Sequence, residues 1–441
     1  MNSSILKYDV WIKKAHILTM DKDFTEYTDT NILIRNGKIE HIGSVDHLSP
    51  IEVSTIIDAS HMILLPPFFN GHNHVAMSLF RGLGNDVPLT TWLQEYIWPA
   101  EKKYINANNV HLGTLVSGIE MIRSGTNLFA DMYFFEEEVA KATIELGMRC
   151  ILGEAILDFP TPNIKNHTEG LKYTRDLNQK YKTESLVSMS IPAHAPYTCS
   201  TSVLSSVSEI SMELEIPATI HLSETSEEVA DSLKAHGKSP VEYLADLGFF
   251  DFHAVCYHCN HLSVNDIKIL KEKQVSVITL PNSNMKLASG ITPVPDLLKA
   301  EVSLGLGTDG AASNNNMSLL SDLQMMIKLQ KVANMDSTVI NAKKALEIAT
   351  TNGAKAYRMH NNLGSIEVGK SADIQFIDTD SAHMQPLYDP YAQIVYSMHE
   401  NDIKHLMVNG RFIMKDRDIL NIDEDRIKFE ARDFARKLNT D

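Results

Sequence analysis

The amino-acid sequence predicts an α/β fold, a (β/α)₈ TIM-like barrel with a small β-sandwich domain that the N- and C-terminal segments form together. Two observations lead to this prediction. Short apolar runs alternate with helical patterns in the middle of the 441-residue chain, and both ends of the chain contain strand-like hairpins. We therefore expect residues 66–365 to form the barrel and residues 1–65 and 366–441 to form the composite β domain.

Each end of the chain contains a predicted hairpin. The stretch "NILIRNGKIEHIG" places two apolar strands around Asn36-Gly37, and "HLMVNGRFIMKD" repeats this arrangement around Asn409-Gly410. Asn-Gly suits a two-residue type I′ turn, because both positions need a positive φ. Neither end has enough apolar surface for a stable sheet, so we expect the ends to pair. The last segment, "DEDRIKFEARDFARKLNT", is typical of a helix, because its start is acidic and basic residues follow.

The middle of the chain contains eight apolar runs, each of which ends in polar residues, Gly or Pro. Helical stretches such as "NANNVHLGTLVSGIEMIRSG" separate several of them. A barrel of this type has about 250 residues, which suits the central segment, although a doubly wound sheet also alternates strands and helices. The eight runs are "LLPPFFNGHNH", "TNLFADMY", "RCILGEAILD", "LVSMSIPAHAP", "IPATIHLSE", "HAVCYHCNH", "VSVITLPNSN" and "VSLGLGTDG".

Composition excludes several classes of function. The net charge is −16 at pH 7, so a nucleic-acid polymer is not an expected partner, whereas a small uncharged nucleoside remains possible. The four cysteines are too few for a disulfide framework, which indicates a reducing compartment. The N-terminus does not have the pattern of a signal peptide, and the most apolar stretch, "MILLPPFF", is too short to span a membrane. We therefore expect a cytoplasmic protein.

Histidines and an aspartate stand at the ends of the apolar runs. The C-terminal ends of barrel strands are where such folds build their active sites, so side chains from separate segments are expected to converge at one mouth. The residues at these ends are His72 and His74 in the first run, His194 in the fourth, His221 in the fifth, His258 in the sixth and Asp309 in the eighth.

His72 and His74 form a pair that favours a metal site. Residues i and i+2 of a strand point to the same face, so both imidazoles can reach one ion. An isolated H-x-H pattern lies in a surface loop about as often as it lies in a metal site. Here the pair follows a buried-looking strand, and three further strand-end histidines follow it, which favours metal binding.

The segment "HLSET" adds His221 and, three residues later, Glu224. If His221 binds a metal from the strand end, Glu224 can reach over the pocket from the loop, where it is suited to carry protons rather than to bind the metal. The alternative is that Glu224 belongs to an ordinary charged loop, "SETSEEVADS", at the start of a helix.

The segment "CYHCNH" contains a C-x-x-C pattern, Cys256 and Cys259. A structural zinc site normally requires a second such pair, and a redox motif requires a thioredoxin-like setting; the sequence has neither. We expect the cysteines to be small packing groups and His258 to be the functional residue. His261 is expected to be structural, although spacing alone does not decide between the two histidines.

The stretch "LGLGTDG" has two interpretations. Gly305, Gly307 and Gly310 spell G-x-G-x-x-G, the pattern of a dinucleotide-binding turn and hence of an NAD-dependent oxidoreductase. That fingerprint requires an acidic residue about 20 positions further on, and none follows at that distance. As the end of a last barrel strand, the same stretch places Asp309 where a fourth metal ligand is missing, and we prefer this interpretation.

Apolar and aromatic residues near the first strand and in "TTWLQEYIWP" are candidates for the wall of a pocket. The alternative is that they belong to the core or to dimer contacts. These residues are Met77, Leu79, Phe80, Trp92 and Trp98.

Six stretches together resemble one known family: "PPFFNGHNHVAMSLFRG", "WLQEYIWPAE", "AHAPYT", "HLSET", "HCNHL" and "LGTDGAASNN". Over essentially its whole length, the sequence resembles the amidohydrolase superfamily, in the branch of 5′-methylthioadenosine/S-adenosylhomocysteine deaminases and their chlorohydrolase-type, guanine deaminase and cytosine deaminase relatives. The resemblance implies one divalent ion per subunit, usually zinc, and a homo-oligomer of dimeric or higher order. It implies metal ligands at His72, His74, His221 and Asp309, catalytic residues at Glu224, His258 and Asp309, and substrate contacts at Glu101, His194, Glu224 and Asp309.

The activity that the resemblance implies is hydrolytic deamination of the 6-amino group of a 5′-modified adenosine, 5′-methylthioadenosine and/or S-adenosylhomocysteine. Asp309 would take a proton from the attacking water, His258 would orient the hydroxide or stabilise the adduct, and Glu224 would protonate the ring nitrogen. Glu101 would hold the ribose hydroxyls, and His194 would contact the substrate.

The sequence departs from the family pattern at two places. Gly71 and Asn73 replace small hydroxyl residues around H-x-H, and Glu154 stands where some members carry an arginine that contacts substrate. A glutamate near the substrate would repel the carboxylate of S-adenosylhomocysteine, which favours methylthioadenosine.

Other functions remain open. The alternatives are deamination of adenosine, guanine, a pterin or aminodeoxyfutalosine, hydrolysis of a chlorotriazine, and a catalytically silent barrel that serves as a scaffold.

Overall fold

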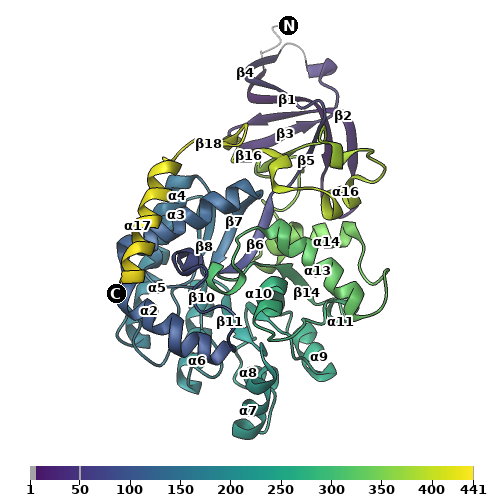
Figure 1. The fold of residues 1–441 in the computed structure, drawn as a ribbon. Coiled ribbons are helices and arrows are strands. Elements are labelled where there is room, and N and C mark those ends of the chain that lie inside the picture. The colour runs from purple at the N-terminus through teal and green to yellow at the C-terminus, as the bar shows by residue number, and fades with distance from the viewer. Residues whose placement is uncertain (1–5, 49–50, 441) are drawn as a thin grey trace.

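The computed structural model describes residues 6–48 and 51–440. Within these residues, strands from both ends of the chain form one nine-stranded sheet, at the top of Figure 1. β5 is the junction, because it pairs in parallel with β1 and antiparallel with β15. In spatial order the strands are β18 (Asp418–Ile419), β17 (Arg411–Lys415), β16 (Ile403–Val408), β15 (Ile374–Asp378), β5 (Met62–Leu65), β1 (Leu6–Leu18), β2 (Glu26–Arg35) and β3 (Lys38–Ile42), with β4 (Ile51–Asp58) paired to β1.

Both predicted hairpin turns are confirmed. Asn36 and Gly37 have φ angles of 52° and 74°, and they connect β2 to the antiparallel β3. Asn409 and Gly410, at 48° and 72°, connect β16 to β17 in the same way. The predicted terminal helix is also confirmed as α17 (Glu424–Thr440).

Each of the eight apolar runs contains at least one strand, and neighbouring strands pair in parallel. Among the described residues they form two parallel sheets. The first consists of β6 (Phe68–Asn73), β7 (Thr126–Asp131), β8 (Arg149–Leu152) and β9 (Val187–Met189). The second consists of β10 (Ile191–Pro192), β11 (Ala218–Leu222), β12 (Ala254–His258), β13 (Ser276–Thr279) and β14 (Ser303–Leu306).

The two parallel sheets meet at two places. The fourth run contains both β9 and β10, with Ser190 between them, so one segment continues from the first sheet into the second. At the other side, the segment after β14 returns to β6, where the backbone N–H of Asp309 donates to the carbonyl of His72 at 3.0 Å. The side chain of Asn70 on β6 also contacts Thr308 through hydrogen bonds of 2.7 and 3.0 Å.

The glycines of "LGLGTDG" serve this close packing. A Cβ on Gly305 would lie 2.8 Å from Ile278, and a Cβ on Gly307 would lie 2.8 Å from the backbone nitrogen of His72. The helix that follows, α12 (Ala311–Asn314), has only four residues. The glycines therefore allow strand contact, and the short helix differs from the long one that follows a dinucleotide-binding turn.

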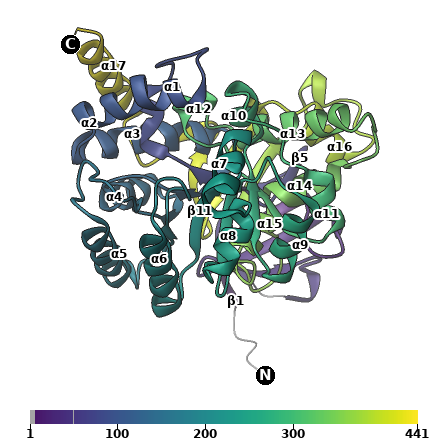
Figure 2. The same cartoon turned by 90° about the horizontal axis from the view of Figure 1, so that it is seen from below.

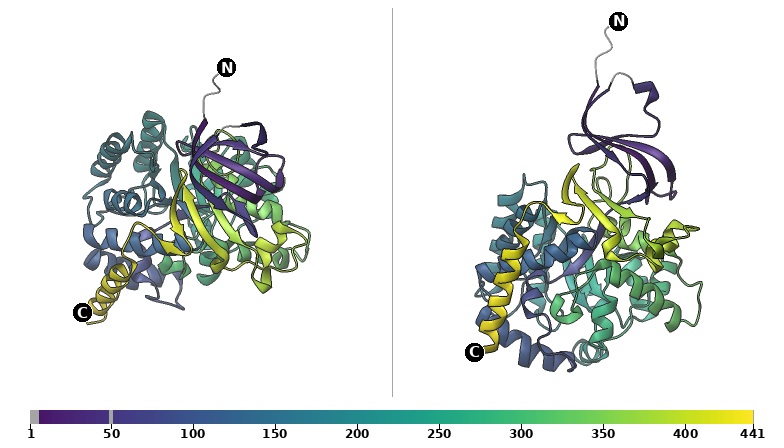
Figure 3. Two further views of the ribbon diagram at one scale, coloured as in Figure 1. Left: turned by 90° about the horizontal axis from the view of Figure 1, so that it is seen from above. Right: turned by 45° about the horizontal axis from the view of Figure 1, so that its top comes forward.

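Helices surround the parallel strands, as the view from below shows in Figure 2. Figure 3 shows the nine-stranded sheet across one end of them and α17 at the periphery. No helix within the described residues is both long enough and apolar enough to span a bilayer. The other helices are α1 (Leu89–Thr91), α2 (Trp98–Tyr104), α3 (Ala107–Arg123), α4 (Glu136–Leu146), α5 (His167–Tyr181), α6 (Thr201–Leu214), α7 (Ser226–His236), α8 (Pro240–Asp246), α9 (Val264–Glu272), α10 (Pro281–Lys286), α11 (Val294–Lys299), α13 (Leu319–Ala333), α14 (Ala342–Ala349), α15 (Thr351–Ala356) and α16 (Pro390–Tyr396). The 3₁₀ turns are η1 (Asp46–Leu48), η2 (Val75–Phe80), η4 (Ala382–Met384) and η5 (Glu400–Asp402), and η3 (Trp92–Ile97) is a π-helix.

Candidate metal centre and active site

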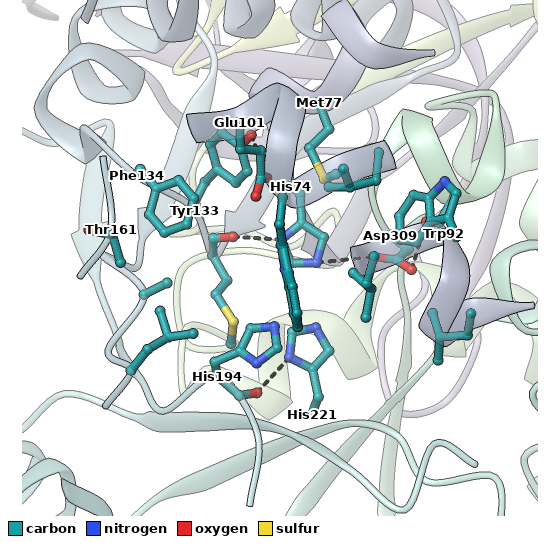
Figure 4. A pocket seen from close by; sticks show the side chains of 18 of the residues that line it. His74, Met77, Trp92, Glu101, Tyr133, Phe134, Thr161, His194, His221 and Asp309 are labelled. Carbon is teal, nitrogen blue, oxygen red and sulfur yellow. Dashed lines mark hydrogen bonds and ion pairs between the residues drawn. The ribbon is translucent and has the colours of Figure 1, made fainter. Parts of the chain in front are cut away.

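A cavity of about 550 Å³ opens at the carboxyl ends of the parallel strands. Its size is typical of a pocket for a small organic ligand. Side chains that follow β6, β7, β8, β10, β11, β12 and β14 all contribute to its wall. Figure 4 shows the imidazoles of His74, His194 and His221 close together in it, with Asp309 to one side and Tyr133 to the other.

Three histidines converge at one end of this cavity. His72, His74 and His221 each present a ring nitrogen, and these atoms all lie within 4.8 Å of one another. The Nε2 atoms of His72 and His221 are 3.1 Å apart. Oδ1 of Asp309 lies 3.6 Å from Nε2 of His72 and 3.2 Å from Nε2 of His74. The structure therefore brings all four residues that the sequence predicts as ligands to one centre.

The hydrogen bonds on the far side of two of these rings determine which nitrogen faces the centre. Nδ1 of His74 lies 2.6 Å from the carbonyl oxygen of Met132, and Nδ1 of His221 lies 2.7 Å from that of His194. A carbonyl oxygen can only accept, so each Nδ1 carries a hydrogen, and Nε2 is the nitrogen that has the lone pair when the ring is neutral. Backbone carbonyls orient metal-binding histidines in the same way in other proteins.

The charge state of the group suits a cation. Burial lowers the pKa of His72 and of His221 well below the ordinary value, so both imidazoles are neutral at pH 7, the form that binds metal. Burial alone would raise the pKa of Asp309, but contact with His74 holds it well below the usual range. Burial by itself would lower the pKa of His74, but its contact with Asp309 raises it to about 9, so an ion would replace the proton that His74 holds beside this carboxylate. Three imidazoles and one ionised carboxylate are a donor set that fits a divalent transition metal.

The backbone conformation and several hydrogen bonds hold the Asp309 carboxylate in place at this centre. Its backbone φ is 63°, in the left-handed region that Asp tolerates better than most residues. The hydroxyls of Ser283 and Ser313 donate to its Oδ2 at 2.6 and 2.9 Å, and the N–H of Gly310 donates to Oδ1. These hydrogen bonds leave the carboxylate little rotational freedom. The sequence pattern did not indicate that either serine would contact Asp309.

Glu224 and His258 face the same cavity. Nε2 of His258 is 3.8 Å from Oε2 of Glu224, and Nδ1 of His258 lies 2.7 Å from Oδ1 of Asn284, which holds the ring. Burial raises the pKa of Glu224. Glu228, which sequence reasoning treated as part of a charged loop, accepts the backbone N–H groups of Ser223 and Glu224 at 2.8 Å each. Glu228 therefore fixes the backbone from which Glu224 projects.

Glu101 and His194 lie at other parts of the wall. The hydroxyl of Tyr133, a residue that sequence reasoning missed, donates to Oε1 of Glu101 at 2.8 Å. Burial raises the pKa of Glu101 to about 7, although the bond from Tyr133 opposes this effect. His194 lines the cavity, and its Nδ1 lies 2.9 Å from the hydroxyl of Thr198. His194 does not belong to the group of converging ligand atoms found among the described residues.

Some of the residues predicted for the pocket wall line the cavity, and others do not. Met77, Trp92 and Trp98 line the cavity. Leu79 and Phe80 do not line it; they pack in the hydrophobic core, which was the alternative interpretation. Phe80 is buried at the end of η2 and packs against Phe434 of α17.

His258, and not His261, lines the cavity, as expected. Nε2 of His261 lies 2.6 Å from the carbonyl oxygen of Ser289, which is a structural contact. Cys256 and Cys259 are free and buried, and burial raises the pKa of both thiols. The expectation that these cysteines are packing groups is therefore confirmed.

The expectation for Glu154 is wrong. Glu154 is fully buried and does not line the cavity. Its Oε2 accepts the N–H of Glu136, and it lies beside the buried Asp131 and Glu136. It therefore cannot repel a substrate carboxylate there by direct contact. Within the described residues, Lys102 is the one side chain of the lysine or arginine type that lines the cavity.

Comparison with known proteins agrees with this geometry. The profile of the amidohydrolase family matches residues 63–413. A protein named 5-methylthioadenosine/S-adenosylhomocysteine deaminase from Syntrophobacter fumaroxidans is 39% identical over 98% of both chains, and one of the same name from Thermoanaerobacter pseudethanolicus is 41% identical over 97% of this chain and 98% of that one. The crystal structure of an adenosine deaminase from Xanthomonas campestris with bound zinc is 30% identical, with a TM-score of 0.96 over 99% of this chain and 100% of that one. This chain is a member of the amidohydrolase family.

Proposed function

We propose that this chain is a metal-dependent deaminase that removes the 6-amino group of a 5′-modified adenosine and releases ammonia. 5′-Methylthioadenosine and S-adenosylhomocysteine are the proposed substrates. The observation that carries the proposal is the convergence of four ligand residues and two acid–base residues on one cavity large enough for a nucleoside. The names of the relatives, which cover nearly the whole chain, support the substrate class.

The proposed cofactor is one zinc ion per chain, held by His72, His74, His221 and Asp309. When bound, such an ion supplies Lewis acidity and lowers the pKa of a coordinated water towards neutrality. Zinc suits three imidazoles and a carboxylate, and the adenosine deaminase structure contains it. Assembly into a homo-oligomer stays a prediction.

We assign the proton transfers to three side chains. Asp309 is ionised and faces the centre, so it accepts a proton from the attacking water. Burial raises the pKa of Glu224, which favours the protonated carboxyl, and this group delivers the proton to the ring nitrogen. Oδ1 of Asn284 accepts from Nδ1 of His258, so Nε2 of the neutral ring accepts a hydrogen bond from the oxygen that attacks the purine and orients it.

The remainder of the cavity fits the proposed nucleoside. Glu101 offers carboxylate oxygens to the ribose hydroxyls, with one of them oriented by Tyr133. His194 contacts the purine. Trp92 and Met77 give the wall apolar surface, which suits a thioether substituent. Lys102 is the group that can attract the carboxylate of a homocysteine tail.

We also infer that the two parallel sheets form one closed (β/α)₈ barrel from residues 66–365, and that residues 1–65 and 366–441 form a separate sandwich-like β domain. The continuous segment through Ser190 and the hydrogen bond between Asp309 and His72 support the closure. The nine-stranded sheet built from both ends of the chain supports the division.

The test is ammonia release with methylthioadenosine, S-adenosylhomocysteine and adenosine, measured side by side. We expect the highest kcat/KM with methylthioadenosine or S-adenosylhomocysteine. If adenosine is the best substrate, the 5′-substituent is assigned wrongly, and if none releases ammonia, the activity itself is wrong.

The variant K102M tests the substituent more directly. We expect kcat/KM to fall for S-adenosylhomocysteine and to stay unchanged for methylthioadenosine, because only the former has a charged tail. K103M is the matched control, since Lys103 does not line the cavity. Equal losses on both substrates would contradict the role of Lys102.

A further inference from the structure

A second group of two histidines and a carboxylate lies outside the cavity. The chain leaves the nine-stranded sheet after β15 and returns at β16, and this excursion contains η4, α16 and η5. In Figure 1, α16 lies beside α14 at one side of the molecule. None of the residues that line the cavity belongs to the excursion. The group consists of His383 in η4, and of His399 and Asp402 around η5.

The three side chains are close enough to share one ion. One ligand atom from each lies within 4.8 Å of the other two. Nε2 of His383 is 2.6 Å from Oδ2 of Asp402. The rings of His383 and His399 are stacked, with centroids 4.2 Å apart and planes 19° apart. Imidazole and carboxylate donors suit a transition-metal ion, but the nearly parallel rings do not direct their nitrogen lone pairs at one point, so the two histidine side chains must rotate apart to bind the same ion.

The carboxylate is fixed, whereas the histidines are accessible. The side chain of Asp402 is 3% exposed, the hydroxyl of Ser381 donates to its Oδ1, and the N–H of His399 donates to its Oδ2. The side chain of His383 is 34% exposed. One ring nitrogen of His399 accepts the backbone N–H of Asp402, so the other nitrogen of the neutral ring carries the hydrogen, and His399 offers a lone pair to an ion when this cap hydrogen bond is released. An ion can therefore reach the site from solvent and find a negative charge already in place.

We propose that His383, His399 and Asp402 form a second metal site, which takes zinc or a similar divalent transition metal and joins η4 to η5 across α16. Imidazole nitrogen favours zinc, nickel, cobalt or copper over calcium and magnesium, which prefer oxygen ligands. With bonds of about 2.0–2.2 Å, two ligands of a tetrahedral zinc lie about 3.3 Å apart. His383 must therefore move outward by several tenths of an ångström, and its exposure permits this. Water completes the coordination.

The two conservative variants H383Q and H399N separate metal binding from the hydrogen bonds. Gln at position 383 can still donate to Asp402, and Asn at position 399 can still accept its N–H as a helix cap, but neither is an imidazole. H360N is the matched control, because His360 is an exposed histidine outside the group. The holoenzyme is dialysed against increasing free zinc, and zinc per chain is measured by elemental analysis.

We expect two zinc ions per chain in the wild type and in H360N, and one in H383Q and in H399N, with unchanged deaminase activity. We also expect added zinc to raise the melting temperature of the holoenzyme by about 2 °C or more, and this shift to be absent in both variants. One ion per chain in the wild type, or a second ion retained in both variants, would overturn the proposal. Melting in the absence of excess zinc checks that the variants fold.

Discussion

The two histidine–carboxylate groups of this protein differ in how the chain builds them. His72, His221 and Asp309 come from strand ends up to 237 residues apart in the chain, and they are almost completely buried. His383 and Asp402 are 19 residues apart, in one excursion at the surface. The buried group depends on the whole parallel sheet, whereas the exposed group depends only on two neighbouring turns.

The comparison shows what burial adds to a set of ligands. Burial holds the imidazoles of His72 and His221 neutral, and backbone carbonyls orient those of His74 and His221, so most of the group is prepared before any ion arrives. The exposed group remains in contact with water, which screens its charges. We therefore expect the buried group to control activity and the exposed group to affect only local stability.

Replacing the aspartate of each group by asparagine, which removes the charge of its carboxylate, should give the largest difference between the buried group and the exposed group. We expect D309N to lose its metal and at least about 10³-fold in kcat, because a contribution of several kcal/mol from the ion is lost. D402N should keep its activity. Metal content and ammonia release are measured for both variants. Loss of activity in D402N, or activity in D309N close to that of the wild type, would break the comparison.

The variant E224Q separates proton transfer from metal binding within the buried group. We expect kcat to fall by about 10²–10⁴-fold while zinc content and melting temperature stay unchanged, because Gln cannot carry the proton. E227Q is the control, since Glu227 is an exposed glutamate three residues further along the chain. Normal turnover of E224Q would refute the role assigned to Glu224.

The variant Y133F tests the positioning of Glu101 and gives a pH dependence. Burial raises the pKa of Glu101 to about 7 and the Tyr133 hydroxyl opposes this, so without the hydroxyl the pKa rises further. Because the ionised carboxylate accepts the ribose hydroxyls, the rising limb of kcat/KM against pH should move to higher pH. One hydrogen bond is worth about 1 kcal/mol, so kcat/KM at pH 7 should fall by up to about 10-fold. An unchanged pH profile would contradict the role of Tyr133.

The smallest expected effect concerns a carboxyl behind the buried group. Burial raises the pKa of Glu154 to about 8, above its value in an unfolded chain, so the folded state binds the proton more strongly. Stability contributed by this group is present at low pH and is lost as pH rises towards 8. We expect E154Q to melt about 1–3 °C higher than the wild type at pH 8.5, with a smaller difference at pH 5. E301Q, at an exposed position, is the control, and a destabilised E154Q at pH 8.5 would contradict the prediction.

Several local features were predictable from the sequence. Asn36-Gly37 and Asn409-Gly410 form the expected turns, because the conformational preference of the dipeptide decides them. The apolar runs indicated where the parallel strands lie, and the residues that follow each run indicated which side chains meet at the carboxyl edge. The candidate ligands could be proposed for that reason, whereas the choice of Asp309 and not His194 as the fourth ligand rested on the resemblance to the amidohydrolase superfamily.

What the sequence by itself determined, then, is the order of the elements and the chemistry that stands at their ends, because apolar periodicity and turn preferences act over a few neighbouring residues. Only the tertiary structure decided which partners hold those side chains. Glu228 beneath Glu224, Tyr133 beside Glu101, and the position of Glu154 outside the cavity are examples. Such contacts depend on how helices and loops pack against the strands, and no local pattern in the sequence encodes that packing.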